Sequence, residues 1–214
     1  MKQAVHCLTR SGFTDPFLGS VSLDPESYCL ASCLRGIPGV SCCAPMSPDQ
    51  IDPTFLLFHR SSPKTSVNLT WDEVNSPALM EQASTYSSLV VVVHGWQEPP
   101  ISSDGNNDWM FRVKDGFLSR GKEAVLIVNW DHGNGLDYAQ SAANVRTVGM
   151  MIGRIIAHWR LQRQTLLVGH SMGAQVLGEA GRFVQRLTGS KIKECHALDP
   201  AGQPPLFELQ CSTQ

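Results

Sequence analysis

The 214-residue sequence lacks the features that would place it inside a membrane or on nucleic acid. Its longest uninterrupted apolar runs, such as Leu89 to Val93, are far shorter than the roughly 20 residues that a membrane-spanning helix needs. It has 17 Lys and Arg against 19 Asp and Glu, and no basic stripe with interleaved aromatic residues, so we expect no nucleic-acid partner. Apolar residues make up 42% of the chain, which is enough for the core of one ordinary domain.

The N-terminus also lacks the apolar stretch of a signal peptide, because Met1 to Leu30 contains several acidic residues. Cysteine is nevertheless abundant there. Five of the seven cysteines fall within the first 43 residues, namely Cys7, Cys29, Cys33, Cys42 and Cys43. Such crowding among turn-forming residues favours disulfide bonds, and we expect the last four of these to be mostly oxidised.

A zinc site is the alternative use of these cysteines, but no Cys-x-x-Cys pair has a matching partner pair, so we expect neither a metal nor a cofactor. A glycosylation sequon occupies Asn68-Leu69-Thr70. Although the missing signal peptide by itself would indicate the cytosol, the cysteines and the sequon favour an extracellular, secreted protein whose natural start lies upstream of Met1.

The chain divides into two parts by composition. Residues 1–46 are rich in Pro, Gly, Ser and Cys and lack periodicity, and we interpret them as an N-terminal extension. In residues 47–214, short apolar runs that predict strands alternate with amphipathic stretches. The predicted strands are residues 55–58, 89–93, 124–128, 165–168 and 194–198, and the predicted helices are residues 138–162 and 172–187. This alternation predicts an α/β fold with a largely parallel sheet covered by helices on both faces.

The sequence Gly169-His170-Ser171-Met172-Gly173 lies between a predicted strand and a predicted helix. This order is typical of a nucleophile elbow, in which the serine takes a strained conformation and small neighbours let the chain double back. Ser171 is therefore the candidate nucleophile. In such a turn the N–H of the next residue, Met172, donates to the oxyanion of the reaction, helped by the positive end of the following helix.

A second oxyanion donor and an acid are expected at the ends of other strands. The loop after residues 89–93 contains His94-Gly95-Trp96, where glycine lets the backbone turn its amides inward, so the N–H of Trp96 is the second candidate donor. Asp199 follows the strand predicted over residues 194–198, and Pro200 stops that strand. Because functional groups gather at the carboxyl ends of strands in open α/β sheets, Asp199 is the candidate catalytic acid.

These residues also have structural interpretations. Asp199 could be an ordinary turn aspartate, which is the commoner role of Asp before Pro. We expect His94 and His170 to shape the oxyanion loop and the elbow rather than to act as bases, because both sit in turns built around glycine. Asn144 and Arg146 could form a solvated helix face, or they could attach the helix to the loops of the sheet.

In combination, the motifs resemble those of the pancreatic lipase family of secreted lipases and related phospholipases. The resemblance covers most of residues 47–203. It is carried by Ser47-Pro48-Asp49-Gln50-Ile51, Thr54-Phe55-Leu56-Leu57-Phe58, Val91-Val92-Val93-His94-Gly95-Trp96, Val128-Asn129-Trp130 with Tyr138, Asn144-Val145-Arg146-Thr147-Val148-Gly149, Gly169-His170-Ser171-Met172-Gly173-Ala174, Gly178-Glu179-Ala180-Gly181-Arg182 and Leu198-Asp199-Pro200-Ala201-Gly202.

The resemblance implies an α/β-hydrolase fold and the hydrolysis of carboxylic esters, in triacylglycerol or phospholipid, at a lipid interface. It implies Ser171 as nucleophile, Asp199 as triad acid, and the amides of Trp96 and Met172 as oxyanion donors, in agreement with the residue-level interpretation.

Three residues depart from the family pattern. Met172 and Gln175 replace the leucine and the histidine that are usual in the elbow, and Asn129 stands where an aspartate is common. The exchange of leucine for methionine is nearly neutral in volume, so we expect the oxyanion amide of Met172 to survive it.

The larger departure concerns the triad histidine, which in the family follows the acid. Residues 200–214 contain no histidine. The only histidine after Ser171 is His196, and it lies too close to Asp199 along the chain to reach across to the nucleophile. We therefore interpret the chain as a lipase domain truncated after the acid-bearing strand and inactive as given. The alternatives are an inactive short form that binds lipid or a partner, and an intracellular serine hydrolase unrelated to lipases.

Overall fold

The computed structural model describes residues 45–98 and 109–201, which contain a six-stranded sheet. The strands are β1 (Thr54–His59), β2 (Ser62–Leu69), β3 (Leu89–Val93), β4 (Ala124–Asn129), β5 (Thr165–His170) and β6 (Glu194–Leu198). Their order across the sheet is β2-β1-β4-β3-β5-β6. β4, β3, β5 and β6 run parallel, whereas β1 is antiparallel to both β2 and β4. The α/β fold is confirmed, with an antiparallel hairpin at one edge of the sheet.

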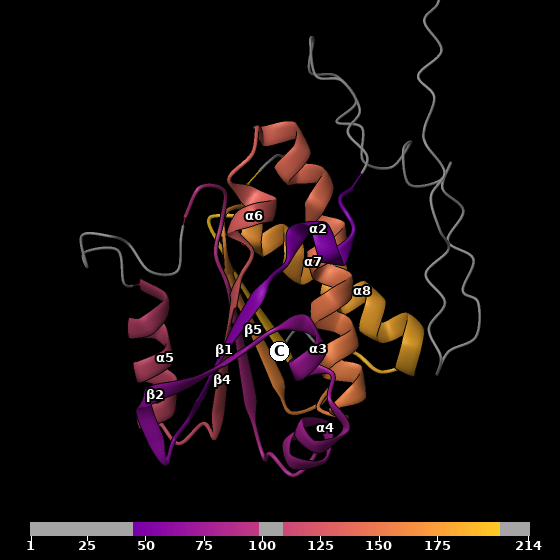
Figure 1. Ribbon diagram of the computed structural model, residues 1–214. Helices are drawn as coiled ribbons and strands as arrows, with labels where there is room; N and C mark the ends of the chain where they lie inside the picture. Colours follow the sequence, from indigo (N-terminus) through magenta and orange to yellow (C-terminus); the bar gives the residue numbers. More distant parts are fainter. Residues whose placement is uncertain (1–44, 99–108, 202–214) are drawn as a thin grey trace, which may run out of the picture.

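Helices cover both faces of this sheet. They are α2 (Pro48–Ile51), α3 (Trp71–Val74), α4 (Pro77–Ala83), α5 (Trp109–Ser119), α6 (Asp131–Asn134), α7 (Tyr138–His158) and α8 (Met172–Thr188). Figure 1 shows α5 on one side of the sheet and α7 packed beside α8 on the other. Among the described helices, none is both long and apolar enough to span a membrane.

The parallel strands are apolar on both faces because each face is covered. Leu89, Val91 and Val93 of β3 belong to the large core between the sheet and α7 and α8, whereas Val90 and Val92 belong to the smaller core beneath α5. All five side chains are fully buried. An uninterrupted run of valines is what a central parallel strand with two covered faces requires.

The two long helices follow the predicted pattern. The Asp137 side chain accepts two backbone N–H groups at the start of α7, and the apolar residues spaced three and four apart along that helix are buried. α8 ends at Gly189, which has a left-handed φ of 69° that suits glycine. The five strands and two helices predicted from the sequence are therefore confirmed, with ends shifted by a few residues.

Two elements escape the sequence patterns. β2 is polar and mostly exposed over residues 62–68, and it joins the sheet by pairing with β1, so it shows no apolar run. α5 follows a segment outside the described residues and buries mainly Met110, Lys114 and Leu118. Almost all of the predicted extension, residues 1–46, also lies outside the described part, so that boundary stays a prediction.

We expect the protein to self-associate through β6, because no described strand pairs with its outer edge. Leu198 on this strand is 40% exposed, and Val67 on the opposite edge strand is 50% exposed. Leu198→Lys should raise the concentration at which dimers form, whereas Val67→Lys should change it little, because β2 is already polar. Sedimentation velocity at protein concentrations from about 1 to about 100 μM measures the fraction of dimer and checks this expectation. A monomer with a sharp cooperative melt at every concentration would contradict it.

Candidate active site

Ser171 lies at the turn between β5 and α8 in a strained backbone conformation, with φ of 51° and ψ of −117°. Two backbone hydrogen bonds hold it there. Its N–H donates to the carbonyl of Leu198 at 2.9 Å, and its own carbonyl accepts the N–H of Ala201 at 3.1 Å. Both partners flank Asp199, so the segment that carries the candidate acid also holds the candidate nucleophile. Strain of this kind at a non-glycine residue is typical of functional sites.

The elbow is possible only because glycines lie at its close contacts. A Cβ on Gly173 would lie 2.4 Å from the carbonyl oxygen of Val93, and one on Gly169 would lie 2.6 Å from the carbonyl oxygen of Gly173. Real Cβ atoms do not approach oxygen this closely. The first turn of α8 therefore packs directly onto the end of β3, as the nucleophile elbow predicted from the sequence requires.

The loop after β3 passes directly beside Ser171, the candidate nucleophile. A Cβ on Gly95 would lie 2.9 Å from the Cβ of Ser171, which places the backbone of the His94-Gly95-Trp96 loop against the serine. Met172 opens α8, where the first N–H groups of a helix have no partner within it. The arrangement brings together the two segments whose amides, those of Trp96 and Met172, are the predicted oxyanion donors.

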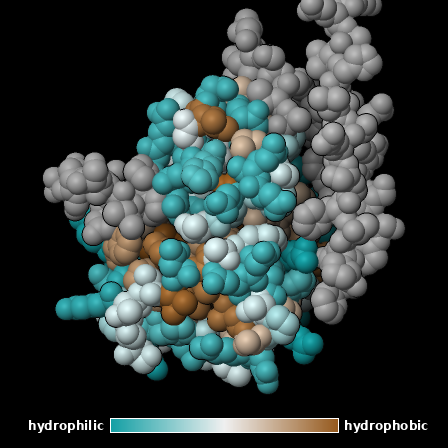
Figure 2. Space-filling model, in the orientation of Figure 1, coloured by the Kyte–Doolittle hydropathy of each residue, from teal (hydrophilic) through white to brown (hydrophobic). Residues whose placement is uncertain are grey.

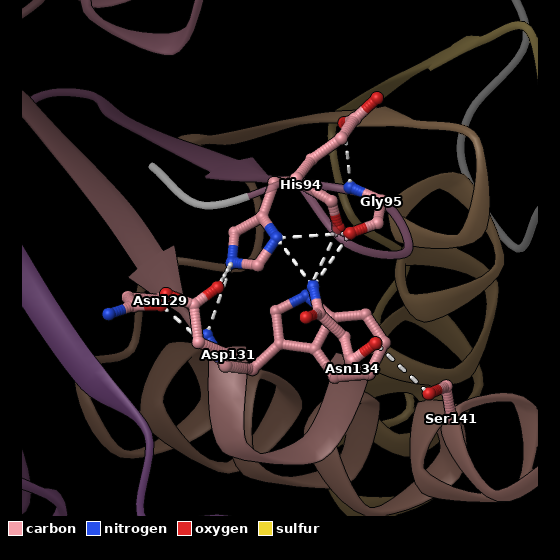
Figure 3. A network of polar contacts seen from close by, with 8 residues as sticks. His94, Gly95, Asn129, Asp131, Asn134 and Ser141 are labelled. Atoms are coloured by element: carbon pink, nitrogen blue, oxygen red, sulfur yellow. Dashed lines mark hydrogen bonds and ion pairs between the residues drawn. The ribbon is translucent and has the colours of Figure 1, made fainter. Parts of the chain in front are cut away.

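The side chain of His94 supports this loop from the interior of the protein (Figure 3). Its side chain is fully buried. The backbone N–H of Trp130 donates to Nε2 at 3.2 Å, Nδ1 lies 3.1 Å from the carbonyl oxygen of Gly95, and the Asn134 amide donates to that same oxygen at 2.7 Å. Burial lowers the pKa of His94 to about 4, so the ring is neutral at ordinary pH. The expectation that His94 shapes the loop is thus supported by its contacts.

Asn144 attaches α7 to neighbouring loops. It is fully buried, its Oδ1 accepts the N–H of Met46 at 2.9 Å, and its Nδ2 donates to the carbonyl of Gly133 at 2.9 Å. Of the two interpretations left open by the sequence for this residue, the structure favours attachment over a solvated face. Arg146 is only half-buried on the same helix.

Asp199 follows β6 and has a left-handed φ of 41°. β6 pairs in parallel with β5, and His170 lies opposite Leu198, so the residues that follow, Ser171 and Asp199, leave adjacent strands at the same edge of the sheet. The Asp199 side chain is exposed. Within the described residues, its carboxylate forms no hydrogen bond or ion pair.

Gln175, one of the departures from the family pattern, attaches the acid-bearing segment to α8. Its side-chain amide donates to the carbonyl of Ala201, two residues after Asp199. Together with the bond from Ala201 to Ser171, this contact closes a small ring of interactions between elbow and acid segment. Sequence patterns alone give no indication of this contact.

The imidazole of His170 contacts the carboxylate of Glu98, with Nδ1 2.8 Å from Oε1 and 3.0 Å from Oε2. The indole of Trp109 packs edge-on against the imidazole, with the ring centroids 5.9 Å apart. These three residues and Leu198 line a cleft of about 310 Å³. Glu98 cannot be identified from sequence patterns, because it belongs to no motif and its partner is 72 residues away.

His196 lies within β6, as expected, and its Nε2 is 2.8 Å from Oε1 of Glu194. In the described part of the chain, no hydrogen bond joins any histidine to Ser171 or Asp199. The nucleophile and acid candidates are therefore brought together, whereas a base is not. The structure leaves the catalytic roles of Ser171, Asp199, Trp96 and Met172 as predictions.

Comparison with known proteins identifies the family. The model of the Lipase family matches residues 40–211. The chain belongs to the pancreatic lipase family. It is 32% identical over 171 residues to pancreatic lipase-related protein 2 of Bos taurus, covering 77% of this chain and 34% of that one. It is 30% identical over 182 residues to phospholipase A1 of Vespa velutina, covering 78% of this chain and 57% of that one.

This chain therefore spans only part of the length of these relatives. The match covers 34% of the Bos taurus protein and 57% of the Vespa velutina protein. A further relative, 27% identical over 144 residues, is named inactive pancreatic lipase-related protein 1, from Canis lupus familiaris, with 64% of this chain and 29% of that one covered. The relatives of this chain therefore include proteins named as enzymes and one named as inactive.

Gly173 and Gly178 on α8 provide a matched test of the elbow packing. Gly173→Ala should destabilise the fold by roughly 2 to 3 kcal/mol, because the methyl group would clash with the backbone of β3. Gly178→Ala should be neutral or stabilise it by up to about 1 kcal/mol, since the nearest atom is 3.9 Å from the new Cβ and alanine favours helix. Urea unfolding measures both. Equal effects at the two sites would contradict the proposed contact.

His94 should make the stability depend on pH. Its pKa of about 4 in the folded state lies below the usual value of about 6.5 in unfolded chains, so the unfolded state binds more protons between these values. Its contribution to stability should therefore be complete above about pH 6.5 and should fall by roughly 2 kcal/mol on acidification to pH 5. His94→Gln should lose this component. NMR titration checks the cause directly, and a His94 ring that protonates near pH 6.5 would contradict it.

Proposed function

We propose that this chain carries the nucleophile and oxyanion-binding part of a serine-dependent carboxylic ester hydrolase that acts on lipid esters, either triacylglycerol or phospholipid. The observation that carries the proposal is the conformation of Ser171, strained between β5 and α8 and held on both sides by the segment that contains Asp199. Family membership supports the same reaction class.

In this proposal the Ser171 hydroxyl attacks the ester carbonyl, and the N–H groups of Trp96 and Met172 stabilise the oxyanion that forms. Asp199 orients the imidazolium of the base during that step. Its exposed carboxylate, without a partner among the described residues, is available for such a base. The close packing of Gly95 against Ser171 supports the placement of Trp96 next to the reacting carbonyl.

We further propose that the 214-residue polypeptide by itself has at most trace activity. His94 is buried and engaged by backbone groups, His170 is paired with Glu98, and His196 is paired with Glu194. Within the described residues, none of these three forms a hydrogen bond with Ser171, so none is positioned to take its proton. A non-catalytic role in binding lipid is the second candidate, and it is favoured by the relative named as inactive.

Apolar side chains support a lipid substrate. Leu136 and Leu198 are 38% and 40% exposed, and the ring of Trp96 packs edge-on against the 39% exposed Tyr138, with centroids 5.3 Å apart. The Trp96 indole donates to the carbonyl of Leu136 at 3.0 Å, so these rim residues are held together. At the end of the molecule where α6 leads into α7, Figure 2 shows a small hydrophobic patch within a mostly hydrophilic surface. Exposed apolar groups around a site are typical of proteins that meet lipid.

We propose an extracellular location. Cys195 is disulfide-bonded, and such bonds persist in oxidising compartments. Asn68 of the glycosylation sequon is exposed on β2, as an acceptor asparagine must be. The predicted oxidation of Cys29, Cys33, Cys42 and Cys43 falls outside the described residues.

Hydrolysis of a short-chain nitrophenyl ester tests the proposed function. Because no histidine of the described residues is hydrogen-bonded to Ser171, turnover should be far below roughly one per second, with a residual rate on the order of a thousandfold over water. Ser171→Ala should leave this residual rate almost unchanged, because the rate comes from the oxyanion-binding amides and substrate binding, and Ser119→Ala, which changes an exposed serine on α5, should behave alike. Turnover at an enzymic rate that Ser171→Ala abolishes would show that a histidine of this chain acts as base. Hydrolysis no faster than in water alone would contradict the proposed oxyanion-binding part.

A further inference from the structure

Glu98 joins the two backbone segments that flank the nucleophile. Its Oε2 accepts the N–H of Gly95 at 3.0 Å and lies 3.0 Å from Nδ1 of His170, while Oε1 lies 2.8 Å from the same nitrogen. Gly95 directly precedes the candidate oxyanion donor Trp96, and His170 directly precedes Ser171. A single carboxylate therefore connects the oxyanion loop to the elbow.

The loop needs such an attachment. After Val93 the chain leaves the sheet, so the backbone of the loop is no longer held by strand pairing. The turn also contains Gln97 at a left-handed φ of 55°, and it is closed by a long bond of 3.4 Å from the N–H of Glu98 to the carbonyl of Gly95. The carbonyl of Gly95 is held by the Asn134 amide at 2.7 Å, and the charge-assisted bond from the Gly95 amide to the Glu98 carboxylate adds a strong second attachment.

The bond also decides which amide is available to a substrate. Because the Gly95 N–H points to Glu98, it cannot also donate to an oxyanion, and the following N–H of Trp96 is left for that role. The carboxylate is 24% exposed and the imidazole 34%, so both groups are partly withdrawn from water, and their bonds are stronger than at an open surface.

We infer that Glu98 is a positioning residue: its carboxylate fixes the oxyanion loop relative to the nucleophile elbow by binding the Gly95 amide and the His170 imidazole together. The inference rests on the proposed function for the role it gives to Trp96. The physical connection itself is independent of whether the chain hydrolyses anything.

Amide hydrogen exchange measured by NMR on the 214-residue chain tests the connection. Glu98→Ala should accelerate exchange of the Gly95 amide by roughly tenfold or more, because the bond to the charged acceptor is lost. Glu98→Gln retains one acceptor oxygen, so it should protect the Gly95 amide partly and rank between Glu98→Ala and the unchanged protein. The Gly95 amide proton should also move upfield in both variants, because a neutral or missing acceptor deshields it less.

Glu123 provides the matched control, because its Oε2 accepts the backbone N–H of Ser87 at 2.7 Å and the Ser87 hydroxyl at 2.8 Å, away from the candidate site. Glu123→Gln should accelerate exchange at Ser87 and leave Gly95 and Trp96 unchanged. If Glu98→Ala unfolds the chain, the comparison of Glu98→Gln with Glu123→Gln decides the question.

Unchanged exchange and chemical shift of Gly95 in the Glu98 variants would overturn the inference. An effect at Gly95 equal to the effect at distant amides would overturn it too, because Glu98 would then contribute only to global stability. Failure of the proposed function would be observed differently: the chain would hydrolyse the ester no faster than water does, while the response of Gly95 to the Glu98 variants would persist.

Discussion

The strained backbone of Ser171 is the constraint on which the rest of this site depends. A φ of 51° at a non-glycine residue is unfavourable, and it persists here because hydrogen bonds from both sides fix the residue. One of these bonds goes to Leu198 and the other comes from Ala201, so the conformation of the nucleophile requires β6 to lie beside β5. The elbow is therefore a product of the sheet as well as of its own glycines.

The same constraint explains why the glycines in the loops around Ser171 leave no room for a larger side chain. Gly173 brings α8 against the end of β3, and Gly95 brings the oxyanion loop against the Cβ of Ser171. Below that loop, the buried neutral ring of His94 joins β3 to Trp130 at the end of β4. Three parallel strands thus contribute backbone to one small region, and buried hydrogen bonds fix their relative positions.

The geometry of this site fits membership of the pancreatic lipase family, and it divides the proposed catalytic machinery into two parts. One part, contained in the described residues, is the candidate nucleophile Ser171, the candidate acid Asp199 and the backbone amides proposed to bind an oxyanion. The base is the other part, and the three histidines nearest to the site in sequence are engaged by backbone or by carboxylates. For an acyl-transfer enzyme, preorganised amides without a base provide a modest fraction of the rate.

The sequence by itself determined the α/β class, five of the six strands, the two long helices and the place of Ser171 in an elbow. It could do so because buried strands, amphipathic helices and glycine-bracketed turns are encoded by residues close together along the chain. It did not determine β2, whose polar residues join the sheet by backbone pairing, nor the partners of Glu98 and Gln175. Those contacts link residues 72 and 26 positions apart, and they exist only because the order of strands brings distant segments to one edge of the sheet. Tertiary structure alone decided them, since local periodicity carries no information about which strands become neighbours.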